Sequence, residues 1–353
     1  MIEAAFAIPG DLATPTGGYA YDRRVMAALP AAGVVARHVA LPSRFPHPTA
    51  DDLRATEAAL RRVPAGVPLL IDGLALGVLP AALLRGLPAP VVALIHHPLA
   101  LETGLTPERR AALAESERAA LACADEVIVT GAATAALLRE EYGVPGVAIT
   151  IAEPGTDRAE RARGGGDPPR LLAVGALVPR KGYDTLVAAL AMVRTLPWTL
   201  TIVGSLDRDP ACVAALRAQI AEAGLADRIT LAGAASEAAL DALYAAADLF
   251  VLASHFEGYG MVLAEAAVRG LPIVATAPAL AAAGFPPETA SAVPAGNASA
   301  LAAAIFEVLG DRTRLQRLAD ASWRYGASLP RWRDTAARIA AVLARVAAKE
   351  RAS

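Results

Sequence analysis

The amino-acid sequence predicts an α/β protein with two doubly wound, Rossmann-like domains in tandem. Short runs of aliphatic and β-branched residues alternate with longer helical patterns along the chain of 353 residues. Such alternation is typical of right-handed β–α–β units that build a parallel sheet. It is interrupted once, at residues 160–170 (ERARGGGDPPR), where glycine, proline and charged residues indicate a linker. A chain of this length has room for two domains that each bury a core.

The apolar runs predict the strands of both sheets. Before the interruption they are Ala4–Ile8, Val34–Ala40, Leu69–Asp72, Val91–Ile95, Glu126–Thr130 and Val147–Ile151, and after it Leu171–Val174, Thr199–Val203, Ile229–Leu231, Leu249–Leu252 and Ile273–Ala275. Helical patterns between them include Tyr19–Ala32, Asp52–Val63, Pro107–Ala122 and Ala132–Glu141. We therefore expect a first domain over residues 1–160, a linker over 161–170 and a second domain over 171–329.

The last segment, residues 330–353, reads as one long amphipathic helix with Trp332, Ile339 and Leu343 near helical spacing. Packing on the second domain is the simplest expectation for it. Doubly wound folds bind ligands at the carboxyl ends of their strands. Two such domains facing each other would enclose a cleft.

Composition excludes several classes of protein. The 33 basic and 35 acidic residues give a net charge of −2, whereas a nucleic-acid-binding protein needs a basic face. No uncharged apolar stretch reaches membrane-spanning length, and the amino terminus lacks the pattern of a secretory signal. The two cysteines, Cys123 and Cys212, are too few for a disulfide framework, so a reducing cytoplasm is the expected setting.

Two glycine-containing loops follow predicted strands and suit an anion. Gly17 and Gly18 come after the first strand and before a helix, where backbone N–H groups can approach a phosphate. Arg180 and Lys181 follow the first strand of the second domain, and their two cations suit a diphosphate. A flexible turn and a solvated Arg-Lys turn are the alternative interpretations.

The stretch from His255 to Glu265 (HFEGYGMVLAE) is the most specific of the chain. It follows the strand Leu249–Leu252 and opens a helix, with Glu257 before the helix and Glu265 in its second turn. Two carboxylates beside a phosphate-binding helix start suit the hydroxyl groups of a sugar and a ribose. The residues between the carboxylates that would surround the ligand are Gly258, Tyr259, Gly260, Met261 and Val262. In the alternative, Glu257 is a cap and Glu265 a surface charge.

These stretches, in this order, resemble the retaining glycosyltransferases of family 4, which have the GT-B fold, and the resemblance spans nearly the whole chain. It implies that Glu257 binds the donor sugar, that Glu265 binds the ribose and that Lys181 binds the donor diphosphate. The donor is then a UDP-, GDP- or ADP-sugar. The resemblance also implies that the final helix returns to the first domain. One departure is Ala176, which stands where the family has a phosphate-binding arginine; Arg180 is the candidate substitute.

His96 and His97 end the fourth predicted strand of the first domain, where an acceptor-side histidine belongs. Adjacent residues of a strand point to opposite faces, so one of the two is expected to face the donor sugar. We favour His97, just before Pro98, and expect His96 to point into the sheet packing. The residues that follow, Glu102 and Thr103, are candidates to line the acceptor pocket.

The reaction implied by the resemblance is transfer of a sugar to an acceptor hydroxyl, with retention of configuration and without a metal or other cofactor. Asp207 and Asp209 resemble an Asp-x-Asp metal motif but fall in a loop of a fold that does not use it. The acceptor is a sugar, a lipid or a small metabolite. Arginines near the carboxyl end make peripheral contact with the inner membrane face a further hypothesis, against a solvated helix face.

Two other activities are compatible with tandem doubly wound domains. One is another GT-B enzyme, such as a nucleotide-sugar epimerase. The other is a nicotinamide-dependent oxidoreductase, but neither half carries G-x-G-x-x-G followed by an acidic residue about 20 positions later.

Overall fold

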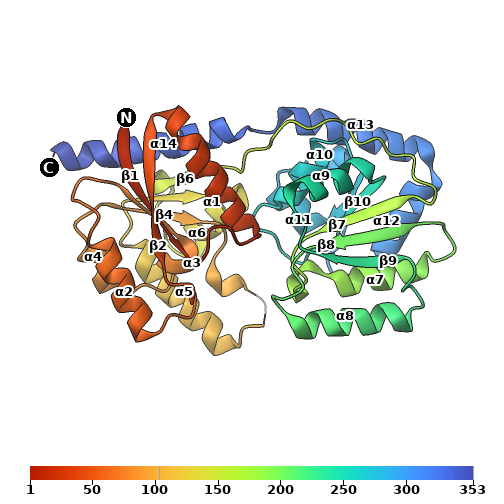
Figure 1. Ribbon diagram of the computed structural model, residues 1–353, viewed down its shortest axis with the longest axis horizontal. Coiled ribbons are helices and arrows are strands. Elements are labelled where there is room, and N and C mark those ends of the chain that lie inside the picture. The colour runs from red at the N-terminus through yellow and green to blue at the C-terminus, as the bar shows by residue number, and fades with distance from the viewer. Residues whose placement is uncertain (103, 353) are drawn as a thin grey trace. The chain divides into compact units, whose positions relative to one another are not determined.

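The computed structural model describes residues 1–102 and 104–352 and contains two compact units (Figure 1). The first unit is made of Met1–Gly155 together with Pro330–Ser353, and the second is Thr156–Leu329. Each has its own sheet and its own core. The segment 156–169, which contains the expected linker except for Arg170 at the start of β7, is held by the second unit, since the N–H of Ala162 donates to the carbonyl of Arg269 and that of Arg163 to the carbonyl of Ala245.

The sheet of the first unit has six parallel strands in the order β2-β1-β3-β4-β5-β6. The strands are β1 (Ile2–Pro9), β2 (Val34–Leu41), β3 (Leu69–Asp72), β4 (Val91–Ile95), β5 (Glu126–Val129) and β6 (Ile149–Ile151). The helices are α1 (Gly17–Ala28), α2 (Ala50–Leu60), α3 (Gly73–Leu76), α4 (Ala81–Arg85), α5 (Pro107–Leu121) and α6 (Ala132–Glu140). Strand order reverses between β1 and β3, which defines a switch point at the carboxyl ends of these strands.

The last helix, α14 (Trp332–Ala352), belongs to the first unit, where it packs on α1 and on β1, β5 and β6 (Figure 1). Its apolar stripe is fully buried at Ile339, Val342 and Leu343. Thr335 donates from Oγ1 to the carbonyl of Glu153 at 2.7 Å, which ties the start of the helix to the end of the first pass of the chain. The return of this helix, expected from the family resemblance, is confirmed, and the simpler expectation that it packs on the second domain is wrong.

The second unit repeats the architecture with the strand order β12-β11-β10-β7-β8-β9, also parallel. Its strands are β7 (Arg170–Val174), β8 (Thr199–Val203), β9 (Ile229–Gly233), β10 (Leu249–Leu252), β11 (Ile273–Thr276) and β12 (Ser291–Val293). Its helices are α7 (Tyr183–Met192), α8 (Pro210–Glu222), α9 (Glu237–Ala246), α10 (Met261–Ala267), α11 (Ala277–Ala282), α12 (Ala298–Gly310) and α13 (Arg312–Ser328). The switch point here lies between β7 and β10.

The alternation of side chains along β7 shows how the sheet builds two apolar layers. Leu171 and Ala173 face a core shared with α7, α8 and α12, whereas Leu172 and Val174 face a core shared with α9, α10 and α11. Both faces are therefore buried, as expected of a parallel sheet covered by helices on each side. The predicted class, two doubly wound domains, is confirmed.

Candidate functional site

The charged residues of the second unit converge at its switch point. Lys181 follows β7 and Glu257 follows β10, and these strands are neighbours in the sheet. Lys181 donates from Nζ to Glu257 Oε1 at 2.5 Å, and Ser254 Oγ donates to the same oxygen at 2.6 Å. Lys181 is 8% exposed and Glu257 7%, so an ion pair is held in the interior at the edge where this fold binds ligands.

The charges around Glu257 keep its carboxyl group ionised. Burial alone would raise the pKa of Glu257, but the charges of Lys181 and Arg180 and the hydrogen bonds from Lys181 and Ser254 bring it below its ordinary value. Burial lowers the pKa of Lys181, and the charge of Glu257 opposes that change. The carboxylate can therefore accept hydrogen bonds from hydroxyl groups, and the ammonium can donate to an anion.

Arg180 lies beside the pair on the same loop. Its Nη1 donates to the carbonyl of Phe256 at 2.8 Å and lies 3.5 Å from Glu257 Oε2. Its Nε is buried and makes no hydrogen bond among the described residues. Ala176, where the resemblance implies an arginine, brings no charge of its own, so Arg180 supplies the second cation of this loop.

Three glycines allow the loops of this site to approach one another. A Cβ on Gly182, whose φ is +63°, would lie 2.2 Å from the carbonyl oxygen of Ala253 at the end of β10. A Cβ on Gly204 would lie 1.9 Å from the carbonyl oxygen of Gly175. Gly175 in turn passes close to the stem of Lys181. The strand ends are thus packed backbone to backbone, which fixes the position of the lysine.

The helix α10 carries the second carboxylate. Gly260, with φ +82°, is its N-cap, so the chain enters the helix in the left-handed region that favours glycine. Met261 and Val262 begin the helix, and Glu265 Oε2 accepts a hydrogen bond from the Tyr244 hydroxyl at 2.8 Å. Gly258 and Tyr259 form the turn before the N-cap. All residues proposed from the Glu257–Glu265 stretch therefore lie at or beside this helix start.

In the first unit, the loop after β1 is braced from α1. The Tyr19 hydroxyl donates to the carbonyl of Pro9 at 2.7 Å, and Arg23 donates to the carbonyls of Leu12 and Thr14. Gly17 and Gly18 begin α1. A Cβ on Gly18 would lie 3.4 Å from the ring of His96, so the glycine pair and the histidine, predicted separately, lie together.

His96 is surrounded by two carboxylates that the sequence analysis did not single out. Its Nε2 lies 3.3 Å from an oxygen of Asp22, on α1, and 3.3 Å from an oxygen of Asp72, at the end of β3. The ring of Tyr21 packs against it edge-on, 5.2 Å between centroids. Burial opposes a charge on the ring, but the two carboxylates outweigh it and raise the pKa of His96 to about 10. This differs from the expected position of His96 in the apolar sheet packing.

The neighbouring histidine has a different partner. His97 Nε2 lies 2.7 Å from Glu102 Oε1, within the short loop after β4. Glu117, buried on α5, accepts from the backbone N–H of Leu99 in that loop at 3.1 Å. The two histidines therefore point to different surroundings, as strand alternation predicts. Thr103 lies outside the described residues.

The Asp-x-Asp motif that the sequence analysis set aside has a structural role. Asp209 Oδ1 accepts from the N–H of Cys212 at 2.9 Å and caps α8. In residues 1–102 and 104–352, the group whose donor atoms lie close enough together to hold a cation is Asp22, Asp72 and His96, within 4.8 Å of one another. Among the described helices, none is both long and apolar enough to cross a bilayer.

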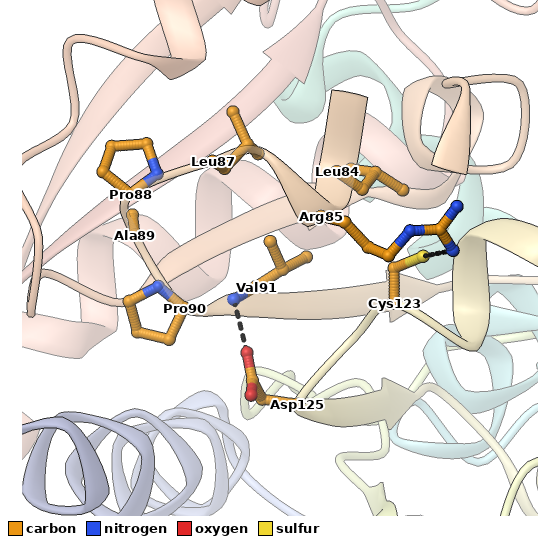
Figure 2. A pocket seen from close by; sticks show the side chains of 9 residues that line it. All are labelled: Leu84, Arg85, Leu87, Pro88, Ala89, Pro90, Val91, Cys123 and Asp125. Atoms are coloured by element: carbon orange, nitrogen blue, oxygen red, sulfur yellow. Dashed lines mark hydrogen bonds between the residues drawn. The ribbon is translucent and has the colours of Figure 1, made fainter. Parts of the chain in front are cut away.

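A separate hollow of about 190 Å³ lies at the opposite edge of the first sheet (Figure 2). It is lined by Arg85, Val91, Cys123 and Asp125 among others, and Val91 begins the strand that His96 follows. Asp125 accepts from the Val91 N–H at 2.8 Å. This hollow lies at the amino ends of the strands, whereas doubly wound folds bind their ligands at the carboxyl ends.

Comparison with known proteins agrees with this geometry. The family model described as Glycosyltransferase Family 4 matches residues 11–160, and the one described as Glycosyl transferases group 1 matches residues 168–311. The two matches fall in the two halves of the chain. Each contains one of the two clusters described above.

Among curated relatives, a D-inositol 3-phosphate glycosyltransferase of Segniliparus rotundus is 38% identical over 135 residues, 37% of this chain and 30% of that protein. A GDP-mannose-dependent alpha-(1-6)-phosphatidylinositol monomannoside mannosyltransferase of Mycobacterium tuberculosis is 31% identical over 190 residues, 50% of this chain and 47% of that protein. The matched stretches thus span less than half of either relative.

Solved structures share the fold over almost the full chain. The sucrose-phosphate synthase of Thermosynechococcus elongatus superposes with a TM-score of 0.84 at 24% identity, covering 99% of this chain and 100% of that one. Anabaena HepE in complex with UDP and glucose superposes with a TM-score of 0.79 at 18% identity, covering 98% and 100%. At these identities the likeness establishes the GT-B fold.

Proposed function

Because this chain belongs to the family 4 glycosyltransferases, we propose that it transfers a hexosyl group from a nucleotide sugar to an acceptor hydroxyl, with retention of configuration and without a metal ion. The observation that carries the proposal is the buried Lys181–Glu257 pair at the switch point of the second unit. A cation and a carboxylate in contact at this edge suit the phosphates and hydroxyl groups of a sugar diphosphate, which supports the proposal.

The departing nucleoside diphosphate is the group that the second unit has to stabilise. Lys181, with Arg180 beside it, would bind its phosphate oxygens, and the first N–H groups of α10 would add donors that have no acceptor within the helix. Charge that develops on the leaving group is stabilised best by donors already in place, because they need no reorganisation during the reaction. Packing at Gly175, Gly182 and Gly204 gives Lys181 that fixed position.

The two carboxylates would orient hydroxyl groups of the donor. Glu257, held ionised by its cationic neighbours, accepts from hydroxyls of the transferred sugar, and Glu265 accepts from the ribose. Gly258 to Val262 would form the wall between them. The first unit would supply the Gly17–Gly18 turn and a histidine, His96 or His97, for the sugar and the acceptor.

The named relatives define which substrates to test. They are glycosyltransferases acting on inositol 3-phosphate and on a phosphatidylinositol mannoside, one of them dependent on GDP-mannose. We propose an acceptor from the same range, a polyol phosphate, a sugar or a lipid headgroup. Both cysteines are free thiols, which supports a cytoplasmic setting. On α14, Arg345 and Lys349 each lie 3.4 Å from Glu126, so part of its positive charge is neutralised within the protein rather than offered to a membrane.

A binding and turnover experiment tests the proposal. UDP-, GDP- and ADP-sugars are titrated by calorimetry, and the best donor is then incubated with the acceptor panel while NMR follows the anomeric configuration of the product. Lys181→Ala and Glu265→Ala should weaken nucleotide-sugar affinity about ten- to a hundred-fold, since each loses a charged hydrogen-bond partner worth about 1.5–3 kcal/mol. Asp207→Ala, on an exposed loop, is the control.

Turnover should be unchanged in excess EDTA. Unchanged nucleotide affinity in both variants would contradict the placement of the donor, and loss of turnover on chelation, reversed by a divalent cation, would contradict the metal-free reaction.

A further inference from the structure

We infer that Asp22 and Asp72 are positioning residues that form ion pairs with the Nε2 end of the His96 ring and keep the ring a doubly protonated, fixed donor whose Nδ1–H is the group offered to the substrate. The inference rests on the proposed function, because it assigns a state to a histidine of the acceptor-side unit. It adds two residues that no sequence motif marks.

The first step is the burial of the carboxylates. The side chain of Asp22 is completely buried, and that of Asp72 is 6% exposed. Asp72 also accepts from the Leu74 N–H at 2.9 Å, as the cap of α3, so its position is fixed by the backbone. Neither oxygen of Asp22 has a hydrogen bond of good geometry among the described residues, and His96 Nε2 lies 3.3 Å from one of them. A buried carboxylate without a partner costs several kcal/mol, so this one needs the cation beside it.

The second step is the number of hydrogens that the His96 ring carries. Nε2 faces two carboxylates at equal distances of 3.3 Å. That is longer than the roughly 2.7–2.9 Å of a charge-assisted hydrogen bond, and Nε2 has no hydrogen bond of good geometry among the described residues, so both contacts are ion-pair contacts that favour a hydrogen and a positive charge at this end of the ring. With Nε2 occupied in this way, an uncharged ring would carry no hydrogen on Nδ1, whereas a charged ring carries one there. Two carboxylates favour the charged ring.

The third step is orientation. The Tyr21 ring lies edge-on against His96 and is itself held by a hydrogen bond of 2.8 Å from its hydroxyl to the carbonyl of Ala152. Gly18 also lies beside the imidazole, since a Cβ on it would be in van der Waals contact with the ring at 3.4 Å. The ring is thus confined between α1 and the ends of β3 and β4. A donor held in this way acts on the transition state without first having to be ordered.

Few other groups near the ring titrate between pH 6 and 9. The charged and titratable residues on the elements packed against it are Tyr19, Tyr21, Asp22, Arg23 and Arg24 of α1 and Asp72 at the end of β3. Burial raises the pKa of Tyr21 well above its ordinary value, so it keeps its proton. Burial also raises the pKa of Asp22 to about 6, against the charge of His96.

NMR of protein labelled at histidine tests the inference without any substrate. The five histidine signals are titrated from pH 5 to 10, and His96→Gln assigns the relevant one. The His96 ring should stay doubly protonated through pH 8.5, whereas in Asp72→Asn its midpoint should fall by about 2.5 pH units or more, so that the ring is mostly uncharged at pH 8.5. Titration of His96 near its ordinary midpoint in the unmodified protein would overturn the inference, even if no sugar donor is found.

The kinetic arm separates positioning from mere stability. For the sugar donor identified above, we expect kcat of Asp22→Asn and Asp72→Asn to fall about tenfold or more at pH 8.5, to recover at pH 6.5, and KM for the donor to change less than about twofold. Asp125→Asn is the matched control, since that carboxylate also accepts a backbone N–H in the first unit but at the opposite edge of its sheet. A loss of kcat that is equal at both pH values, or that Asp125→Asn shares, would count against the positioning role. A protein without sugar transfer would refute the proposed function while the NMR result still stands.

Discussion

Several charged side chains in this protein are buried in small groups, and the charge of each is compensated by the other members of its group. Glu257 is compensated by Lys181 and Ser254, and the carboxylates around His96 by the imidazole. Glu117 is different, since it is completely buried on α5 and its partners are neutral. It accepts from the Leu99 N–H and from the Tyr142 hydroxyl, which do not balance its charge.

Glu117 therefore makes the stability of the first unit depend on pH. Burial raises its pKa from 4.5 to about 7, against the two hydrogen bonds. A folded-state pKa above the unfolded value means that the folded protein binds this proton more tightly. The free energy of unfolding should thus be greatest below pH 4.5 for this group and fall as pH rises to about 7, by about 3 kcal/mol.

Glu117→Gln should remove that slope, because the amide oxygen still accepts from Leu99 and no charge appears. Denaturant unfolding between pH 4.5 and 8 measures it. Glu115→Gln, on the same helix but with a side chain 76% exposed, is the control and should leave the slope as it is. Equal slopes for the Glu117→Gln variant and the unmodified protein would contradict this account of the buried carboxyl.

Single residues of the site were predictable where a strand end or a motif marks them. Lys181 and Glu257 follow strand ends that the apolar pattern predicts, so their convergence follows from topology, and Glu265 lies on the helix that comes after Glu257. The direct Lys181–Glu257 contact does not follow from topology, because it joins residues 76 positions apart through a packing of loops. Asp22 was not predicted as a site residue because it occupies one polar position of an ordinary helix. Asp72 was not predicted either, although it ends a predicted strand.

At the scale of elements, the apolar pattern predicted each described strand except β12, and it did not predict the short helices α3 and α4. Four strands, β3, β4, β8 and β10, have the bounds expected. The edge strand β12 has three residues, and α3 and α4 have four and five, too few to show a period. These pieces form because the neighbouring elements hold them, so only the folded sheet reveals them.

The turn between β7 and α7 is the element on which the proposed donor site depends most. Gly182 ends the turn Pro179–Lys181 and begins α7 with φ +63°. Gly182→Ala should push this turn away from Ala253. We expect nucleotide affinity to fall about as much as in Lys181→Ala, and the melting temperature to fall as well. Calorimetric titration and thermal unfolding provide both readouts.

Gly224→Ala is a close control for that change. Gly224 has φ +67° and nothing within 4 Å of an added Cβ, so it measures the cost of the backbone conformation alone, about 1–2 kcal/mol. Its nucleotide affinity should stay normal. If both alanine variants bind nucleotide equally well, close packing of the turn is not what places Lys181.

At the scale of the whole molecule, the chain enters the second unit after Gly155 and comes back to the first at Pro330. The outgoing and returning segments touch inside the first unit, where a Cβ on Gly155 would lie 2.2 Å from the backbone nitrogen of Trp332. The first unit is therefore closed by residues from both ends of the chain. Its helix α14 fills a core that residues 1–155 leave incomplete.

This closure predicts which part of the protein a change in α14 affects. Leu343 is fully buried against the first unit, so Leu343→Ala should lower the free energy of unfolding of that unit by about 2–5 kcal/mol through lost contacts and the space left behind. Nucleotide affinity should be unchanged, because Lys181, Glu257 and Glu265 all belong to residues 156–329. Arg333→Ala, at a side chain 82% exposed on the same helix, should change neither quantity. Differential scanning calorimetry with and without the nucleoside diphosphate identifies the affected unit, since the ligand stabilises only the unit that binds it. If Leu343→Ala lowers the melting temperature of the ligand-stabilised transition as much as that of the other transition, α14 supports both units. The assignment of α14 to the first unit alone would then be wrong.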